Sequence, residues 1–232
     1  MAIFYVPNIA LGNFLPEEES QHAVKVLRLQ VGDTIDLVDG IGGFYKAKIT
    51  NPHPKRCSFD IFETIPEYGK RNYKLHIAIA PTKNIERLEW FIEKVTEIGI
   101  DEITPIVCRY SERKIIKSER LEKIIISASK QSEKAYFPTL NPICTFNDLI
   151  KNHQAQSKLI AHCYEDDKKL LQNEIIKSTD ILILIGPEGD FSREEVEKAI
   201  SAGYKPISLG ESRLRTETAG IVACCTTAII NQ

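Results

Sequence analysis

The chain has 232 residues, of which 43% are hydrophobic and 27% are charged, a globular composition that excludes a disordered or fibrous protein. This length accommodates one large domain or two smaller ones. The net charge of −2 argues against a protein that coats nucleic acid through bulk charge, because such binding requires an excess of Lys and Arg to neutralise phosphates. Any nucleic-acid partner must therefore be held by a local patch.

The cysteines and histidines do not form a recognisable metal-binding or redox motif. The 6 cysteines include no C-x-x-C pair, which argues against a zinc ribbon or a thioredoxin-like site, and the 5 histidines are scattered. We therefore expect no metal. The segment Met1–Leu15 lacks the basic start of a signal peptide, and no apolar stretch is long enough to span a bilayer, so we expect a cytoplasmic protein.

The chain up to about residue 65 consists of short segments separated by turns. Thr34–Val38 and Phe44–Thr50 are predicted strands, joined by the glycine-rich hairpin turn Asp39–Gly43. Phe59–Thr64 alternates apolar and polar residues, which predicts another strand. Because Pro16–Leu29 has helical periodicity, this part of the chain is predicted to form a small β-barrel with one amphipathic helix.

A polar segment that carries Pro and Gly, Pro66–Asn72, predicts a linker. After it, short apolar runs alternate with helical patterns, which indicates an α/β domain with a mostly parallel sheet. The predicted strands are Leu75–Ala80, Ile103–Cys108, Lys158–Cys163, Ile181–Ile185 and Lys205–Gly210, and the predicted helices are Ile85–Ile98, Ser118–Glu133, Asp167–Lys177, one beginning after Ser192, and Thr216–Ile230. We therefore expect two domains, 1–68 and 73–232.

The clearest candidate for a ligand site follows the apolar strand Ile181–Ile185. The strand ends in Gly186-Pro187-Glu188-Gly189, and Ser192 and Glu195 have the spacing of a capping box that begins a new helix. Ligands of open α/β sheets bind at the carboxyl ends of the strands, and glycines let the backbone approach a ligand closely. A tight turn without a ligand is the alternative for this loop taken alone.

A second strand, Lys205–Gly210, also ends in glycine. Its loop, Glu211–Arg215, leads into the last predicted helix, so both loops are expected at the same edge of the sheet. Arg213, Arg215 and Glu217 carry charges that need partners if they are buried near the crevice. A structural ion pair between Arg215 and Glu217 is the alternative to a role in chemistry.

The spacing of the relevant residues excludes other common nucleotide-binding and catalytic motifs. The glycines near residue 40 do not form G-x-G-x-x-G after a strand, and the Walker motif G-x-x-x-x-G-K-[ST] is absent. No Ser/His/Asp set, H-E-x-x-H or carboxylate pair stands at catalytic spacing. The residues alone therefore indicate a crevice for a ligand without naming the ligand.

These motifs resemble those of the RsmE family in the SPOUT superfamily of RNA methyltransferases, and the similarity extends over most of the chain. IGPEG followed by LG and LRTETA is specific to this family, whereas each half alone is weaker evidence for it. The matching pieces are His22–Gly32, Glu93–Pro105, Ser111-Glu112-Arg113, Gln131-Ser132, Ile185–Gly189, Leu209-Gly210 and Leu214–Ala219. The chain departs from the family pattern at Glu211-Ser212-Arg213, where Pro-Arg-Ile is frequent, so the part that this stretch plays in the pocket is open.

The resemblance implies a fold, a cofactor and a substrate. The second domain would be a trefoil-knotted α/β methyltransferase domain that forms a homodimer, and the first would be a PUA-like β-barrel that helps to hold RNA. The reaction would transfer a methyl group from S-adenosylmethionine to N3 of uridine 1498 in 16S ribosomal RNA, within the 30S subunit. The cofactor would be bound by Ile185, Gly186, Pro187, Glu188, Gly189, Leu209, Gly210, Leu214, Arg215 and Ala219.

Uracil N3 bears a proton that must leave during methylation, so the reaction needs a base or a cation that stabilises the developing negative charge. We hypothesise that Arg215 stabilises or orients the uracil and that Glu217 fixes Arg215; the sequence identifies no general base. RNA contacts are expected from His22, Lys25, Arg28 and Arg113. The alternatives are a SPOUT enzyme that acts on transfer RNA or 23S RNA, and an inactive RNA-binding module.

Overall fold

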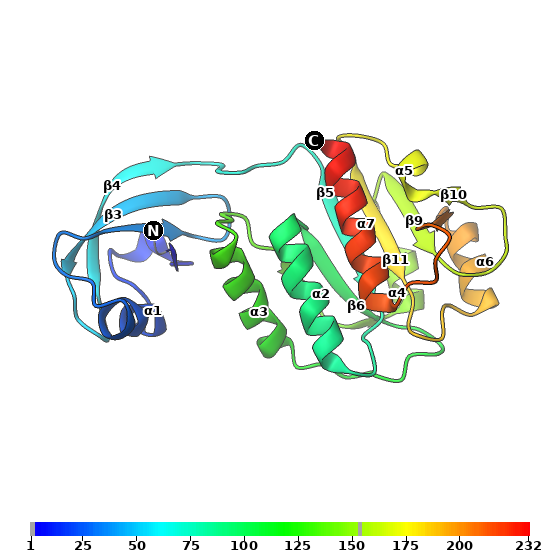
Figure 1. Ribbon diagram of the computed structural model, residues 1–232, viewed down its shortest axis with the longest axis horizontal. Helices are drawn as coiled ribbons and strands as arrows, with labels where there is room; N and C mark the ends of the chain where they lie inside the picture. The colour runs from blue at the N-terminus through cyan, green and yellow to red at the C-terminus, as the bar shows by residue number, and fades with distance from the viewer. Residues whose placement is uncertain (1–2, 153–154) are drawn as a thin grey trace. The chain divides into compact units, whose positions relative to one another are not determined.

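The computed structural model describes residues 3–152 and 155–232, which divide into two compact units (Figure 1). The first unit comprises Met1–Lys70 and Ile126–Phe137, and the second comprises Arg71–Ile125 and Pro138–Gln232. None of the helices in the described residues is long and apolar enough to cross a membrane.

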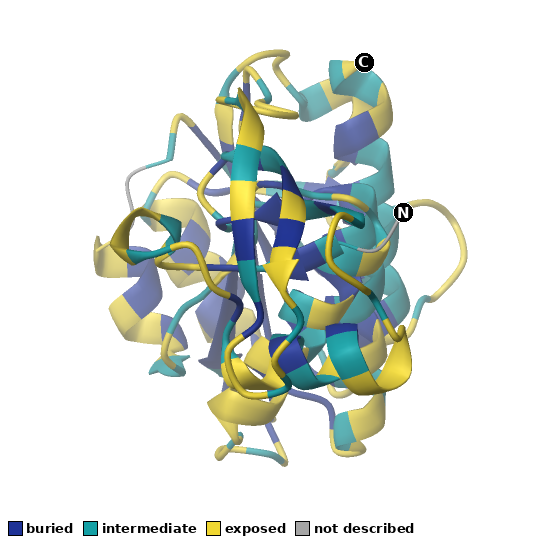
Figure 2. Ribbon diagram, turned by 90° about the vertical axis from the view of Figure 1, so that its left-hand side faces the viewer, coloured by how far each residue is buried: buried dark blue, intermediate teal, exposed yellow. Residues whose placement is uncertain are grey.

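The first unit contains a four-stranded sheet in the order β1-β2-β3-β4. Alternate side chains of its strands are buried, as expected for a sheet with one face on a core (Figure 2). The core contains the aromatic rings of Phe4 and Phe59 and smaller apolar side chains between them. The strands are β1 (Ile3–Tyr5), β2 (Thr34–Val38), β3 (Phe44–Asn51) and β4 (Ser58–Ile65), with β1 parallel to β2 and the other pairs antiparallel. The prediction of a small β domain is confirmed.

The predicted helix Pro16–Leu29 is shorter and less regular than expected. It consists of α1 (Glu17–Gln21) and a π-helical turn, His22–Val26, in which Leu27 N–H donates to the carbonyl of His22 at 3.0 Å. Arg28 then adopts a left-handed backbone conformation with φ of 56°, which ends the helix. Arg28 therefore lies beyond the end of the helix, although the predicted helix Pro16–Leu29 included it.

The segment 126–137 packs with the first unit although it is far away in the sequence. Ala135 is fully enclosed with Val38 and Phe44, and its carbonyl accepts a hydrogen bond of 3.0 Å from Gly42 N–H. The ring of Phe137 lies against Tyr5, with 4.7 Å between the centroids. No sequence pattern indicated these long-range contacts, and the domain limits 1–68 and 73–232 stay a prediction.

The second unit is built on a parallel sheet in the order β10-β12-β9-β11-β5-β6-β7, with β8 also paired to β6. Its central strand β11 (Asp180–Ile185) is buried along its apolar residues, because helices cover a parallel sheet on both faces. The other strands are β5 (Lys74–Ile79), β6 (Glu102–Val107), β7 (Thr139–Leu140), β8 (Cys144–Thr145), β9 (Ser157–Ala161), β10 (Lys169–Leu170) and β12 (Lys205–Ser208). The predicted parallel α/β domain is confirmed, whereas the trefoil knot stays a prediction.

Two helices of this part of the chain, α2 (Ile85–Ile98) and α6 (Arg193–Ser201), begin at clear capping signals. Asn84 accepts a hydrogen bond from Glu86 N–H at the start of α2, and Ser192 and Glu195 form the predicted capping box of α6. The predicted helix Asp167–Lys177 is wrong, because Lys169–Leu170 pairs with β12 and leaves only a short helix. The helices are α2 (Ile85–Ile98), α3 (Ser118–Gln131), α4 (Phe146–Asn152), α5 (Leu171–Glu174), α6 (Arg193–Ser201) and α7 (Thr216–Asn231).

Helices α2 and α7 approach closely at Gly220. A Cβ at this position would overlap the ring of Phe91, lying 2.8 Å from its Cδ2 atom and 3.2 Å from Ile79 Cδ1. Phe91 is fully buried, so its ring has no free space into which it can move. Glycine at this position therefore permits the contact between the two helices.

We expect Gly220→Ala to lower the free energy of unfolding by about 1–3 kcal/mol, because overpacking outweighs the gain in helix propensity. Urea denaturation measures this change. Phe91→Leu makes room for the added methyl group, so the double variant should lose less stability than the sum of the single variants. Additive losses would show that the Phe91 ring is not the group that alanine meets.

Candidate functional site

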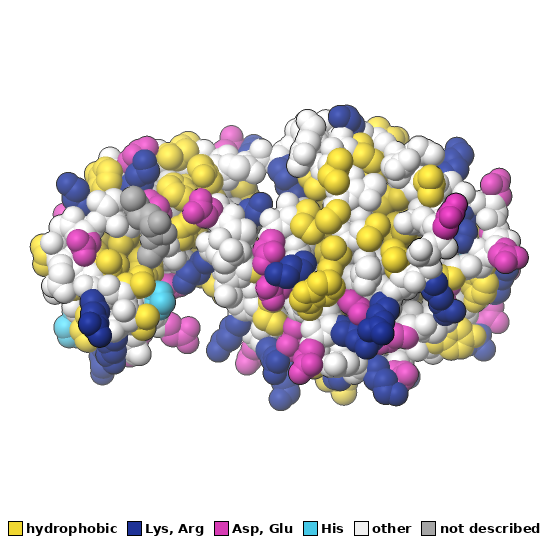
Figure 3. Space-filling model, viewed as in Figure 1, with side chains coloured by type: hydrophobic (Ala, Val, Ile, Leu, Met, Phe, Trp, Pro, Cys, Tyr) yellow, Lys and Arg dark blue, Asp and Glu magenta, His cyan; other side chains and the backbone are white. Residues whose placement is uncertain are grey.

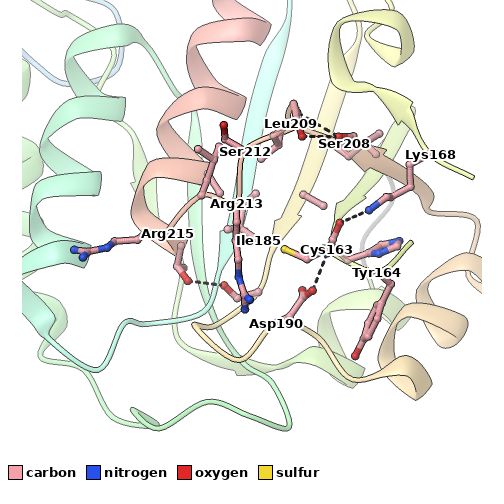
Figure 4. Close-up of a pocket in the computed structure, with 18 of the residues that line it drawn as sticks. Cys163, Tyr164, Lys168, Ile185, Asp190, Ser208, Leu209, Ser212, Arg213 and Arg215 are labelled. Atoms are coloured by element: carbon pink, nitrogen blue, oxygen red, sulfur yellow. Dashed lines mark hydrogen bonds between the residues drawn. The ribbon is translucent and has the colours of Figure 1, made fainter. Parts of the chain in front are cut away.

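A cavity of about 640 Å³ opens at the carboxyl ends of β9, β11 and β12 (Figure 4). It is lined by residues 161–165, 185–188 and 207–216, together with Lys168, Asp190 and Ala219. This volume lies in the usual range for a small-molecule pocket, and the position is where open α/β sheets bind their ligands.

The strands that carry the two glycine loops are not neighbours, since β9 lies between β11 and β12. Their loops nevertheless line the same cavity, and residues 161–165 at the end of β9 lie there too. The sequence predicted β9 as an apolar run but did not place its end in the site. The order of strands in a sheet depends on tertiary pairing, which an apolar run does not reveal.

Most residues that the resemblance assigned to a cofactor come together here. Ile185, Gly186, Pro187, Glu188, Leu209, Gly210, Leu214, Arg215 and Ala219 all line the cavity. Gly189 is the exception, because it faces Tyr110: a Cβ on Gly189 would lie 3.1 Å from Tyr110 Cβ. The lack of a side chain at Gly189 thus lets the loop pack against Tyr110.

The loop after β11 is held in place by hydrogen bonds from several elements. Thr216 Oγ1 donates to the carbonyl of Gly186 at 3.1 Å, and Lys83 N–H donates to Glu188 Oε1 at 3.0 Å. Asp190, with φ of 66°, accepts a hydrogen bond of 2.7 Å from Cys163 N–H, which ties the ends of β9 and β11 together (Figure 4). The cavity wall is therefore fixed before any ligand binds.

A polar loop after β9 forms the wall on the other side. Tyr164 Oη donates to the carbonyl of Phe191 at 2.7 Å, and the Arg193 guanidinium lies 4.1 Å from the centroid of the Tyr164 ring. Arg193 also binds both carboxylate oxygens of Asp166, and this hydrogen bonding lowers the pKa of Asp166. The loop 162–168 is thus attached to the segment that follows β11.

His162 is a buried polar residue of this wall, with 6% of its surface exposed. Neither ring nitrogen has a hydrogen-bond partner among the described residues, while Lys168 Nζ donates to the backbone carbonyl of His162 at 2.7 Å. Burial, followed by the charge of Lys168, lowers the pKa of His162 from its ordinary value of 6.5. The imidazole is therefore neutral at pH 7.

This lowered pKa predicts a dependence of stability on pH. Between about pH 6.5 and the lower pKa of His162 in the folded chain, the unfolded chain binds a proton that the folded chain does not, so the free energy of unfolding falls as pH decreases. The slope contributed by one histidine is at most about 1.4 kcal/mol per pH unit. We expect His162→Leu to reduce the slope between pH 6.5 and 5 in urea denaturation, with His53→Leu as the exposed control. An unchanged slope in His162→Leu would contradict the prediction.

The predicted contact between Arg215 and Glu217 is wrong. Residues two apart on a helix do not face each other, and no ion pair joins these two described side chains. Glu217 is buried and lies beside Arg87 on α2, with 3.8 Å between Oε1 and Nε, while its Oε2 has no partner among the described residues. Arg215 is exposed, and its guanidinium points away from the cavity (Figure 4).

The residues expected to contact RNA lie in both units. His22, Lys25 and Arg28 are exposed on the first unit, near the exposed apolar side chains of Val26 and Val31. Basic and acidic side chains are interspersed on the face of the molecule in Figure 3, in keeping with the balanced charge of the chain.

Arg113 differs from these residues because it is partly buried in the second unit. It donates to the backbone carbonyls of Thr82 and Lys83. Among the described residues, no group of three or more His, Cys, Asp or Glu side chains is placed to hold a metal ion.

Two family models match the chain. The model of an RNA methyltransferase domain matches residues 69–228, and that of an RNA methyltransferase PUA domain matches residues 15–62. The ribosomal RNA small subunit methyltransferase E of Rickettsia conorii is 33% identical over 90% of this chain and 86% of its own length. The protein of the same name from Bacillus subtilis is 29% identical over 89% of this chain and 85% of its own length.

Solved structures show the same fold over both units. A probable rRNA methyltransferase from Porphyromonas gingivalis has a TM-score of 0.95 and 44% identity, covering 100% of this chain and 98% of its own. A ribosomal RNA small subunit methyltransferase E from Neisseria gonorrhoeae, bound to S-adenosylmethionine, has a TM-score of 0.83 and 27% identity, covering 97% of this chain and 95% of its own. The chain therefore belongs to the ribosomal RNA small subunit methyltransferase E family of RNA methyltransferases.

Proposed function

We propose that this protein transfers a methyl group from S-adenosylmethionine to N3 of a uridine, position 1498, in 16S ribosomal RNA. The observation that carries the proposal is the cavity at the ends of β9, β11 and β12, whose lining includes residues of the IGPEG and LRTETA motifs in a chain of that family. The cofactor bound to the Neisseria gonorrhoeae relative supports the same ligand here.

The residues of the cavity fit S-adenosylmethionine. Ile185, Leu209 and Leu214 supply apolar side chains suited to a purine ring. Gly210, with φ of 125°, has no atom within 4 Å of where a Cβ would stand, so the space beside its Cα is open to a ligand, while Ser208 Oγ holds its N–H and its carbonyl. Ser208 and Lys168 add polar groups that suit the ribose and the methionine carboxylate.

When bound, S-adenosylmethionine supplies an activated methyl group, and the protein must hold the uracil in line with it. We assign Arg215 to the uracil. It caps the start of α7 at the cavity, and its exposed guanidinium, which points outward, is accessible to RNA (Figure 4). Its guanidinium stabilises the negative charge that develops on the ring when the N3 proton passes to water, which leaves the N3 electron pair to bond the methyl group. Glu217 supports the site through its ion pair with Arg87, which holds the start of α7 against α2, and not through Arg215.

The RNA backbone is held by His22, Lys25 and Arg28 of the first unit. All three are exposed, and Lys25 and Arg28 flank the exposed apolar side chains of Val26 and Leu27. Cations of this kind contact phosphates and position the RNA without reading its sequence. The substrate is the 16S RNA of the 30S subunit, which places the protein in the cytoplasm.

We infer a homodimer formed through the second unit. Apolar side chains gather on the surface over α7 and α2 (Figure 3). Ile229 of α7 is 68% exposed and Trp90 of α2 is 46% exposed, and a second copy of the chain would cover such side chains. Sedimentation analysis should give twice the mass of one 26.2 kDa chain.

The experiment that tests the function compares 16S RNA from wild-type and deletion strains by mass spectrometry. Loss of one N3-methyluridine at position 1498, restored by the wild-type gene, is the expected result. An unchanged 16S RNA with a methyl group missing from transfer RNA or 23S RNA would assign another substrate. Isothermal titration of the purified protein with S-adenosylmethionine tests the cofactor, since an RNA-binding module without activity would bind none.

A further inference from the structure

Three loops that follow neighbouring strands interlock beside the cavity. The strands β11, β5 and β6 lie next to one another in the sheet, and their loops contain Gly186–Gly189, Thr82-Lys83 and Ser111-Glu112-Arg113. The first of these loops lines the cavity and the other two do not. The contacts that fix the loops after β5 and β6 therefore determine the surroundings of the loop Gly186–Gly189.

Arg113 joins the loop after β6 to the loop after β5. Its Nε donates to the carbonyl of Thr82 at 3.1 Å, and its Nη2 donates to the carbonyl of Lys83 at 2.8 Å. The planar guanidinium thus binds two consecutive carbonyls, a geometry that a lysine ammonium does not reproduce. Hydrogen bonds from a charged donor are stronger than those between neutral groups.

The loop after β5 is joined in turn to the cavity wall. Lys83 N–H donates to Glu188 Oε1 at 3.0 Å, and Lys83 Nζ lies 2.9 Å from Glu112 Oε2. Glu188 belongs to the glycine loop that lines the cavity. A continuous path of hydrogen bonds therefore runs from Arg113 through the backbone of residues 82–83 to the cofactor loop.

We propose that Arg113 is a positioning residue for the cofactor loop. By fixing the carbonyls of Thr82 and Lys83, it aims Lys83 N–H at Glu188 and sets the shape of the Gly186–Gly189 wall before S-adenosylmethionine binds. This inference rests on the proposed function, because it takes S-adenosylmethionine as the ligand of the loop. It replaces the expected phosphate contact of Arg113, two of whose nitrogen atoms are already engaged within the protein.

The two roles predict different measurements on the full-length protein without RNA. A positioning residue affects the affinity for S-adenosylmethionine alone, whereas a phosphate contact leaves that affinity unchanged. We expect Arg113→Gln and Arg113→Lys each to raise the dissociation constant for S-adenosylmethionine about tenfold in isothermal titration, the size of effect that two lost hydrogen bonds produce. Lys117→Gln, which removes an exposed cation from the same stretch, should leave it unchanged.

Steady-state kinetics separate this role from a general loss of structure, which would lower kcat as well as raise KM. The Arg113 variants should raise KM for S-adenosylmethionine about tenfold, with kcat at saturating cofactor and KM for RNA within about twofold of wild type. Glu188→Leu cuts the same path at its other end. Its effect on the dissociation constant should therefore not add to that of Arg113→Lys, because the two changes break one connection.

Three outcomes are distinguishable. An unchanged dissociation constant for S-adenosylmethionine in both Arg113 variants, with weaker RNA binding and a shallower salt dependence, would assign Arg113 to a phosphate and overturn the proposal. Additive effects of Arg113→Lys and Glu188→Leu would also overturn it. Absence of S-adenosylmethionine binding by the wild-type protein would instead refute the proposed function, since the inference requires that ligand.

Discussion

Replacing Arg215 by alanine is expected to lower kcat about 100-fold while changing the dissociation constant for S-adenosylmethionine by no more than about twofold. The reason is that the backbone and the guanidinium of Arg215 lie in different places. Its backbone begins α7 and lines the cavity, whereas its guanidinium points away from the cavity (Figure 4). Alanine keeps the backbone and removes only the charge that we propose to act on the uracil.

Single-turnover kinetics with saturating cofactor and RNA measure the chemical step directly. Arg215→Lys keeps a positive charge without the planar fork, so its rate should lie between those of wild type and Arg215→Ala. If Arg215→Ala binds S-adenosylmethionine normally and turns over at the wild-type rate, the arginine has no part in stabilising the uracil.

Sequence patterns predicted the elements whose local signals agree with their packing. The helix Ile85–Ile98 has helical periodicity after the capping residue Asn84, and it spans the predicted residues. The strand β11 is a run of Ile and Leu, which only a strand covered on both faces requires. At such places local preference and tertiary contact favour the same structure.

The features that the sequence did not predict depend on contacts between distant residues. Lys169–Leu170 lies in a stretch with helical periodicity, but pairing with β12 overrides that preference. The segment 126–137 packs with the first unit through Ala135 and Phe137, more than 80 residues from their partners in β1, β2 and β3. No local pattern encodes either contact.

The candidate site was predictable to the extent that it consists of loops at strand ends. Glycines after β11 and β12 marked two walls of the cavity, and family motifs named the ligand. The third wall, 161–165, was missed because β9 ends without glycine, and its position between the other two strands follows from sheet order. The partner of Glu217 was misassigned because Arg87 lies 130 positions away in the chain and reaches it only through the packing of α2 on α7.

The strongest test of the cavity itself is to fill it. Ala219 lies on α7 and its side chain lines the cavity, so leucine at this position places three more carbon atoms where S-adenosylmethionine is proposed to bind. We expect Ala219→Leu to raise the dissociation constant for S-adenosylmethionine about 100-fold, since steric overlap of this kind costs about 1–3 kcal/mol.

The helix should tolerate the change, because leucine and alanine have similar helix propensities and the added carbons enter open space instead of the core. The melting temperature of Ala219→Leu should therefore stay within about 2 °C of wild type. Thr218→Leu is the matched control: it adds bulk to the preceding residue of α7, which does not line the cavity, and should leave cofactor affinity unchanged.

Taken with the Arg215 variants, this substitution separates cofactor binding from chemistry at two positions four residues apart at the start of α7. Ala219→Leu should lose activity because the cofactor is excluded, so activity should return in part as the S-adenosylmethionine concentration rises. Arg215→Ala should lose activity at every cofactor concentration, because it lacks the charge that we propose to stabilise the uracil. Normal S-adenosylmethionine binding by Ala219→Leu would place the cofactor outside this cavity, and the assignment of Ile185–Gly189 and Leu209–Ala219 to the pocket would then be wrong.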